Sequence, residues 1–176
     1  MRAIGIVGWS GAGKTTLITR LIPELNRRDL SVSTIKHAHH GFDVDRPGKD
    51  SFAHRAAGAS EVLVASSARI ALMRELRGAP EPSLIELLGL LAPVDLVLIE
   101  GYKREPFAKI EVFRAANGKP PLYPDDPRIV ALASDGPPRA GLEHAAIDDV
   151  AAIADLVVRR AEPVATLLDR FASSHS

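Results

Sequence analysis

A glycine-rich segment near the amino terminus constrains the fold of this chain more than any other feature. Residues 8–15, Gly-Trp-Ser-Gly-Ala-Gly-Lys-Thr, match the phosphate-binding pattern G-x-x-x-x-G-K-[ST] in full. A short apolar run at residues 3–7 precedes the segment, and apolar residues at helical spacing follow it between residues 17 and 25. Strand, loop and helix are the context in which this pattern binds phosphate, so the sequence predicts a nucleotide-binding α/β fold.

The residue types of this segment, called the phosphate loop below, suit a nucleotide. Glycines let successive backbone N–H groups turn toward a phosphate chain, and the positive end of the following helix faces the same anion. Lys14 would reach the β- and γ-phosphates, and Thr15 would offer its hydroxyl to Mg²⁺. The residues expected to bind nucleotide here are Gly8, Ser10, Gly11, Ala12, Gly13, Lys14, Thr15 and Thr16.

Composition limits the remaining possibilities. Lys and Arg together number 22, as do Asp and Glu, so the overall charge gives no argument for a nucleic-acid partner. The chain has no cysteine, which excludes disulfides, thiolate metal sites and cysteine nucleophiles. No apolar run approaches a membrane span, and no signal-peptide pattern precedes the first strand. We therefore expect a cytoplasmic protein that does not contact the membrane.

The pattern along the chain alternates strands with helices. It predicts strands at residues 31–37, 95–100, 109–113 and 128–133, and helices at 14–28, 52–57, 82–92, 149–160 and 163–171. The alternation of polar and apolar residues at 109–113 predicts that this strand is half exposed. Residues 61–65 and 69–73 are separated by three residues, which predicts an antiparallel hairpin. We expect a three-layer P-loop NTPase fold of the α/β class, with a mainly parallel sheet. A single domain would cover residues 1–172, followed by a flexible tail at 173–176.

Polar residues follow three of the predicted strands, at the edge where ligands collect in open α/β sheets. Glu100 would act on the Mg²⁺ of a bound nucleotide, directly or through water, or as a base. Lys36 and His37 would face the phosphates. Asp135 could accept the two donors of guanine, N1 and N2. However, its Ala-Ser-Asp context lacks the Asn-Lys-x-Asp pattern of well-known GTPases, and a helix-cap or turn role is an alternative.

A polar segment at residues 38–50 predicts a long loop with a functional role. With His37, its His39 and His40 place three histidines within four positions, which suggests a transition-metal site. Contact with phosphate or a second substrate is the interpretation that we prefer, and a solvated loop is the third.

Several motifs, taken in order, closely resemble the family of molybdopterin-guanine dinucleotide biosynthesis adaptors, MobB. Besides the phosphate loop, they are Thr-Ile-Lys-His at 34–37 with His39 and His40, Asp-Val-Asp-Arg-Pro-Gly-Lys-Asp-Ser at 43–51, Arg-Ala-Ala-Gly-Ala at 55–59, Asp-Leu-Val-Leu-Ile-Glu-Gly-Tyr-Lys at 95–103 and Lys-Ile-Glu-Val at 109–112. The resemblance runs from Gly8 to about Asp135. Many proteins share the phosphate loop alone, whereas the other motifs are far narrower.

This resemblance implies a GTP-binding homodimer with weak GTP hydrolysis at most. Its partner would be the guanylyltransferase that joins GMP to molybdopterin. The resemblance leaves open whether molybdopterin itself contacts this chain. GTP and Mg²⁺ would be its cofactors. Carried over to this sequence, the resemblance assigns phosphate and Mg²⁺ binding to Gly11, Gly13, Lys14, Thr15 and Thr16, the strand-end acid to Glu100, and the second-strand motif to Lys36 and His37.

Two other functions remain compatible with the residues. A metallochaperone GTPase would carry nickel or zinc on His37, His39 and His40, although the absence of cysteine argues mildly against it. A small-molecule kinase would use lid arginines, for which Arg46, Arg55, Arg69 and Arg104 are available. No motif places an arginine finger or a water-positioning glutamine, so we expect any GTP hydrolysis to be slow.

Overall fold

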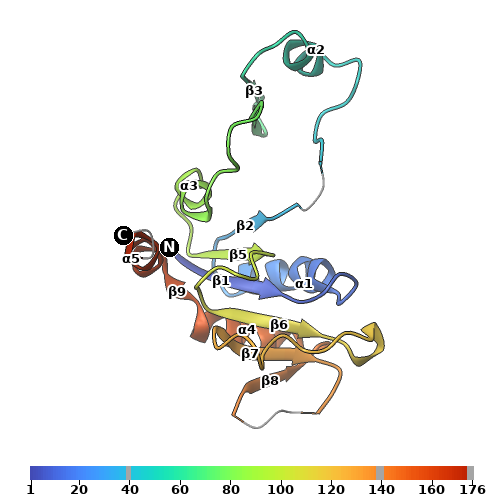
Figure 1. Cartoon of the computed structure of the whole chain (residues 1–176), viewed down its shortest axis with the longest axis vertical. Coiled ribbons are helices and arrows are strands. Elements are labelled where there is room, and N and C mark those ends of the chain that lie inside the picture. The colour runs from blue at the N-terminus through green and yellow to red at the C-terminus, as the bar shows by residue number, and fades with distance from the viewer. Residues whose placement is uncertain (39–40, 138–140, 174–176) are drawn as a thin grey trace. The chain divides into compact units, whose positions relative to one another are not determined.

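The chain forms two compact units, which Figure 1 shows as ribbons. The computed structural model describes residues 1–38, 41–137 and 141–173. The first unit comprises residues 1–37 and 85–176, and the second comprises residues 38–84. Compact units of one chain need not be independent folding domains, so the single domain over residues 1–172 stays a prediction. Residues 174–176 of the predicted tail lie outside the described residues.

The first unit is built on a mainly parallel sheet (Figure 1). In the described residues its strand order is β2 (Val32–Lys36), β5 (Leu96–Glu100), β1 (Arg2–Val7), β6 (Lys109–Phe113), β7 (Ile129–Ser134) and β8 (Glu143–Ala146). A short strand, β9 (Glu162–Pro163), pairs antiparallel with the start of β1. The predicted α/β fold with a mainly parallel sheet is thereby confirmed.

Two helices, α1 (Lys14–Arg27) and α4 (Val150–Arg160), pack against each other and contact the sheet. The apolar residues of α1 recur at helical spacing and are buried: Leu17, Ile18, Leu21 and Leu25. They join the buried side of the sheet in one hydrophobic cluster. The 3-10 turn η1 (Ala115–Asn117) and α5 (Val164–Ser173) also belong to this unit, and the short helix α3 (Leu84–Gly89) begins at the last residue of the second unit and continues into the first.

Strand β6 is buried on both faces, which contradicts the half-exposed strand that its alternation predicts. Lys109 and Glu111 are 1% and 0% exposed. Lys109 donates to Asp126 at 2.7 Å, and Glu111 accepts the backbone N–H groups of Leu122 and Tyr123 at 2.7 and 2.9 Å. The prediction fails because β6 lies between β1 and β7, where the residues 118–127 loop supplies partners for both charges.

The second unit contains α2 (Asp50–Ala56) and the hairpin of β3 (Glu61–Ala65) and β4 (Ile70–Arg74). The two strands pair antiparallel, as predicted. Arg55 holds the preceding loop, because its guanidinium donates two hydrogen bonds to Asp43, at 2.8 and 2.9 Å. These bonds hold the pKa of Asp43 down at about 2. Asp43 is therefore already paired.

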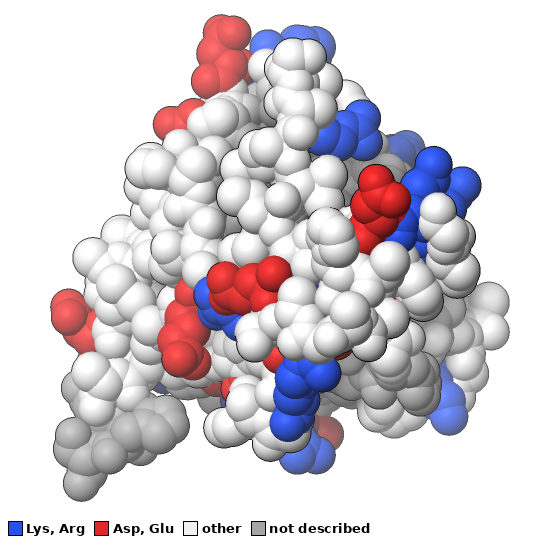
Figure 2. Space-filling model, turned by 90° about the horizontal axis from the view of Figure 1, so that it is seen from above, with Lys and Arg blue, Asp and Glu red and all other residues white. Residues whose placement is uncertain are grey.

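Surface charge is of both signs. Figure 2 shows Lys and Arg side chains interspersed with Asp and Glu side chains on the face that it draws, as the equal totals of the sequence lead one to expect. None of the helices in the described ranges combines the length and the apolar character needed to cross a membrane.

Candidate nucleotide-binding site

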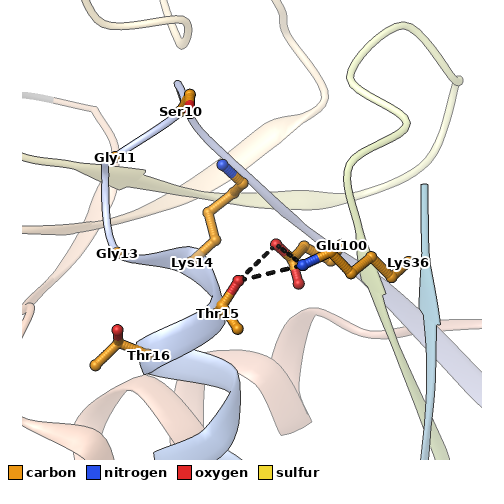
Figure 3. A pocket seen from close by; sticks show the side chains of 8 residues that line it. All are labelled: Ser10, Gly11, Gly13, Lys14, Thr15, Thr16, Lys36 and Glu100. Carbon is orange, nitrogen blue, oxygen red and sulfur yellow. Dashed lines mark hydrogen bonds and ion pairs between the residues drawn. The ribbon is translucent and has the colours of Figure 1, made fainter. Parts of the chain in front are cut away.

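Most of the predicted binding residues meet in one cavity of the first unit, at the carboxyl ends of the parallel strands. The cavity has a volume of about 400 Å³. It is lined by Ser10, Gly11, Gly13, Lys14, Thr15, Thr16, Lys36 and Glu100, which Figure 3 labels. Gly8 and Ala12 belong to the same loop but are buried beneath this lining. The strand-end rule therefore brings residues from β1, β2 and β5 to one place.

The glycines of the phosphate loop are required by its backbone. Gly8 has a φ of 145°, and a methyl group there would collide with the carbonyl oxygen of Val112 on the neighbouring strand. Gly11 and Gly13 have φ values of 81° and 97°, which other residues rarely adopt. The loop therefore turns tightly between β1 and α1 and leaves its concave side open.

Lys14 is the first residue of α1, and its ammonium group reaches back over the loop. Its Nζ donates to the carbonyl oxygens of Gly8 and Trp9, at 3.1 and 3.0 Å. Burial lowers the pKa of Lys14, while the carboxylate of Glu100 acts in the opposite direction. The amine is thus a half-buried cation at the place where the loop turns inward.

Thr15, Glu100 and Lys36 form a polar triangle on one side of the cavity (Figure 3). The Thr15 hydroxyl donates to Oε1 of Glu100 at 3.0 Å. The Nζ of Lys36 lies 3.5 Å from the same hydroxyl oxygen and 3.4 Å from Oε1 of Glu100. Strand pairing sets this geometry, because Lys36 and Glu100 are register partners. A hydroxyl and a carboxylate oxygen side by side are ligands that Mg²⁺ prefers, so these residues fit that ion.

Besides Gly8 and Ala12, two predicted site residues, His37 and Asp135, lie outside the cavity lining. His37 packs its ring on Tyr102, with ring centroids 4.8 Å apart, and its backbone N–H donates to the Glu100 carbonyl. Asp135 uses Oδ1 to accept the backbone N–H of Ala115 at 3.1 Å, which ties the end of β7 to η1. His37 therefore borders the Glu100 turn, and Asp135 holds the turn after β6.

The transition-metal hypothesis falls largely on residues that the structure does not describe, since His39 and His40 lie outside the described residues. Across residues 1–38, 41–137 and 141–173, no group of three or more His, Cys, Asp or Glu residues is arranged to hold a metal ion.

The turn after β6 supports the phosphate loop, and the sequence interpretation missed it. Nδ2 of Asn117 donates to the Ser10 carbonyl at 3.1 Å, and Nε1 of Trp9 donates to the Pro120 carbonyl at 2.7 Å. Lys103 places its ammonium 4.4 Å from the centre of the Trp9 ring. This turn follows β6 at the same edge of the sheet as Glu100, so the strand-end rule also points to it.

Comparison with known proteins gives consistent matches. The chain matches the family model of MobB, molybdopterin guanine dinucleotide synthesis protein B, over residues 3–135. The molybdopterin-guanine dinucleotide biosynthesis adapter protein of Escherichia coli (strain K12) is 43% identical over 158 residues, which span 88% of this chain and 90% of that protein. The adapter protein of Haemophilus influenzae is 41% identical over 157 residues, with coverage of 88% and 86%.

Solved structures agree in fold. A crystal structure of molybdopterin-guanine biosynthesis protein B is similar to this chain with a TM-score of 0.70 and 29% identity, covering 89% of this chain and 98% of that one. The crystal structure of Bacillus subtilis MobB gives a TM-score of 0.69 at 25% identity, with coverage of 92% and 99%. The match of family model, full-length relatives and fold shows that this chain belongs to the MobB family of molybdopterin-guanine dinucleotide biosynthesis adapter proteins.

Proposed function

We propose that this adapter protein binds GTP with Mg²⁺ at the phosphate loop, and that the bound nucleotide controls its association with the guanylyltransferase of the pathway. The observation that carries the proposal is the set of groups in one cavity: Lys14 over the loop, and Thr15 beside Glu100. A loop cation and a pair of oxygen ligands are what a Mg²⁺-bound phosphate chain requires.

Four side chains of the cavity have tasks in this proposal. Lys14 neutralises the β- and γ-phosphates, while the loop N–H groups and the start of α1 orient them. Thr15 and Glu100 would hold Mg²⁺, which neutralises charge on the phosphates when bound. Lys36 then pairs with the terminal phosphate from the β2 side. The lining residues include no glutamine that could position the attacking water, which supports slow hydrolysis rather than efficient turnover.

The second unit offers protein-binding surface for the partner or for a second copy of the chain. Its hairpin exposes large apolar side chains, with Leu63 at 64%, Ile70 at 74% and Leu72 at 49% of their surface. Apolar side chains gathered on an exposed surface are typical of protein-interaction sites. This hairpin can therefore serve as the contact surface in the proposed homodimer or in the complex with the guanylyltransferase.

Guanine selectivity is expected to depend on Asp135. The change Asp135→Asn keeps an oxygen that can accept the Ala115 N–H but replaces the acceptor of guanine N1–H and N2–H with an NH₂ group. In the unchanged protein, titration calorimetry with Mg²⁺ should give tighter binding of GTP than of ATP. The variant should lower the ratio of GTP affinity to ATP affinity by about tenfold or more, because charge-assisted hydrogen bonds to guanine are lost.

Asp29→Asn is the matched control for this experiment. Asp29 is exposed just after the far end of α1, and its φ of 60° suits asparagine as well as aspartate. Equal GTP-to-ATP ratios for the protein, the control and Asp135→Asn would refute Asp135 as the guanine acceptor. No binding of either nucleotide would refute the proposed function.

A further inference from the structure

An arginine with no assigned role lies beside the phosphate loop. Arg114 directly follows β6 and is half-buried. A Cβ atom placed on Gly13 would lie 3.5 Å from Nε of Arg114 and 4.0 Å from Nη2, so the guanidinium passes close over Gly13. Gly13 immediately precedes Lys14 and the start of α1. Arg114 therefore brings a positive charge to the loop whose sequence pattern predicts phosphate binding.

The side chain of Arg114 is not needed to hold the turn that follows β6. Within the described part of the chain, its guanidinium makes no hydrogen bond and no ion pair. The turn is held instead by Asn117 on the Ser10 carbonyl and by Asp135 on the Ala115 N–H. A half-buried cation without a partner is costly, and an anion at the loop would offset that cost.

The position of Arg114 relative to the other charged groups indicates which phosphates it would contact. Strand β1 lies between β5 and β6, and the two flanking strands are on opposite sides of it. Glu100 and Thr15, the fitting Mg²⁺ ligands, lie on the β5 side with Lys36 beyond them. That side accommodates the terminal phosphate. Arg114 lies on the β6 side, toward Asp135, where the nucleoside end of the ligand belongs in the proposed function.

We propose that Arg114 is a binding residue for the α- and β-phosphates of the nucleotide. This inference rests on the proposed function, because it assumes a nucleotide on the phosphate loop. It adds a cation opposite Lys36, so that the phosphate chain lies between positive groups from β2 and from the turn after β6. Because α- and β-phosphates are present in both GDP and GTP, Arg114 contributes equally to the affinity for both.

The test compares Arg114→Met and Arg114→Lys with the unchanged protein, using calorimetric titration with GDP and with GTP in Mg²⁺. Arg114→Met should weaken the binding of both nucleotides equally, by about ten- to a hundredfold, the range for one charged hydrogen-bonding group. Arg114→Lys should recover part of the loss, because it restores the charge. The thermal midpoint without ligand should not fall in either variant, since the side chain makes no described bond whose loss would destabilise the fold.

Arg27→Met is the control, because it removes the same charge from the other end of α1. At 1.5 Å per residue, that end of the helix lies about 20 Å from the loop. The Arg27→Met variant should therefore bind GDP and GTP with unchanged affinity. Unchanged GDP affinity in Arg114→Met, a loss confined to GTP, or a lysine variant as weak as the methionine variant would each overturn the inference. If Lys14→Ala lowers affinity while Arg114→Met does not, the proposed function survives and the role of Arg114 fails.

Discussion

Lys14→Ala should weaken the binding of GTP and GDP by about a hundredfold or more, because it removes a charged donor from a half-buried phosphate site. The fold should be unaffected. The ammonium group donates to two carbonyl oxygens of its own loop, and Lys14 itself lines an open cavity, so water can take the place of the ammonium group when the lysine is absent. Burial lowers the pKa of Lys14, which means that the folded protein disfavours the charged form of this amine. Removing the amine therefore takes away no charge that stabilises the fold.

Titration calorimetry with both nucleotides and a thermal unfolding curve without ligand measure the two expectations. Lys119→Ala serves as the control, because Lys119 is an exposed lysine of the same unit outside the cavity lining. If Lys14→Ala binds GTP as tightly as the control does, the phosphate loop is not the nucleotide site. If instead it fails to fold, the loop has a structural role that the geometry does not predict.

Glu111→Ala should lower the free energy of unfolding by about 3 kcal/mol or more, because it leaves two partly buried N–H groups without an acceptor and removes buried side-chain volume. The carboxylate is fully buried and accepts from Leu122 and Tyr123. Burial raises the pKa of Glu111, whereas these two N–H donors stabilise the charged form. Since Pro120 in the same loop accepts from Trp9, loosening this loop should also disturb the phosphate loop.

Urea unfolding followed by circular dichroism gives this free energy. Glu105→Ala is the matched control, since no side-chain hydrogen bond or ion pair of Glu105 occurs in the described ranges, and its loss should stay within about 0.5 kcal/mol. A loss below about 1 kcal/mol for Glu111→Ala would mean that water replaces the carboxylate, and that the 118–127 loop is not held by it.

Local sequence signals were sufficient for the strands and helices that carry the phosphate loop. The apolar run before Gly8 and the stripe from Leu17 to Leu25 become β1 and α1, because both patterns are continuous and have a clear period. The hairpin of β3 and β4 followed from three turn residues between two strand-like runs. Helix α1 runs through Pro23 to Arg27, so the proline does not end it.

Features that depend on distant residues could not be predicted in this way. Strand β6 shows polar alternation, yet its charges are buried because partners come from a loop later in the chain. Strands β8 and β9 are short, and their pairing is set by the neighbours β7 and β1 rather than by their own residues. Likewise, no local pattern brings Arg114 to Gly13, since that approach depends on β1 and β6 being adjacent.

The candidate site likewise contains residues whose positions the local sequence predicts and residues whose contacts depend on more distant parts of the chain. The phosphate loop and the strand-end residues Lys36 and Glu100 were predicted from type and position, and the structure brings them together. His37 and Asp135 were assigned by the same rule, but they lie outside the cavity lining and contact Tyr102 and Ala115 instead. A position at the end of a strand places a residue at the edge of the sheet where the cavity lies. The direction of its side chain, however, depends on the turn that follows the strand.

The most direct test of the central claim is co-purification of the guanylyltransferase with this protein, with Mg²⁺ and GTP, with Mg²⁺ and GDP, and without nucleotide. The proposed function predicts that GTP changes the amount of transferase retained, and that Lys14→Ala abolishes this dependence while keeping the nucleotide-free level. Equal retention under all three conditions would contradict nucleotide control of the adapter, and no retention under any of them would contradict the partner itself.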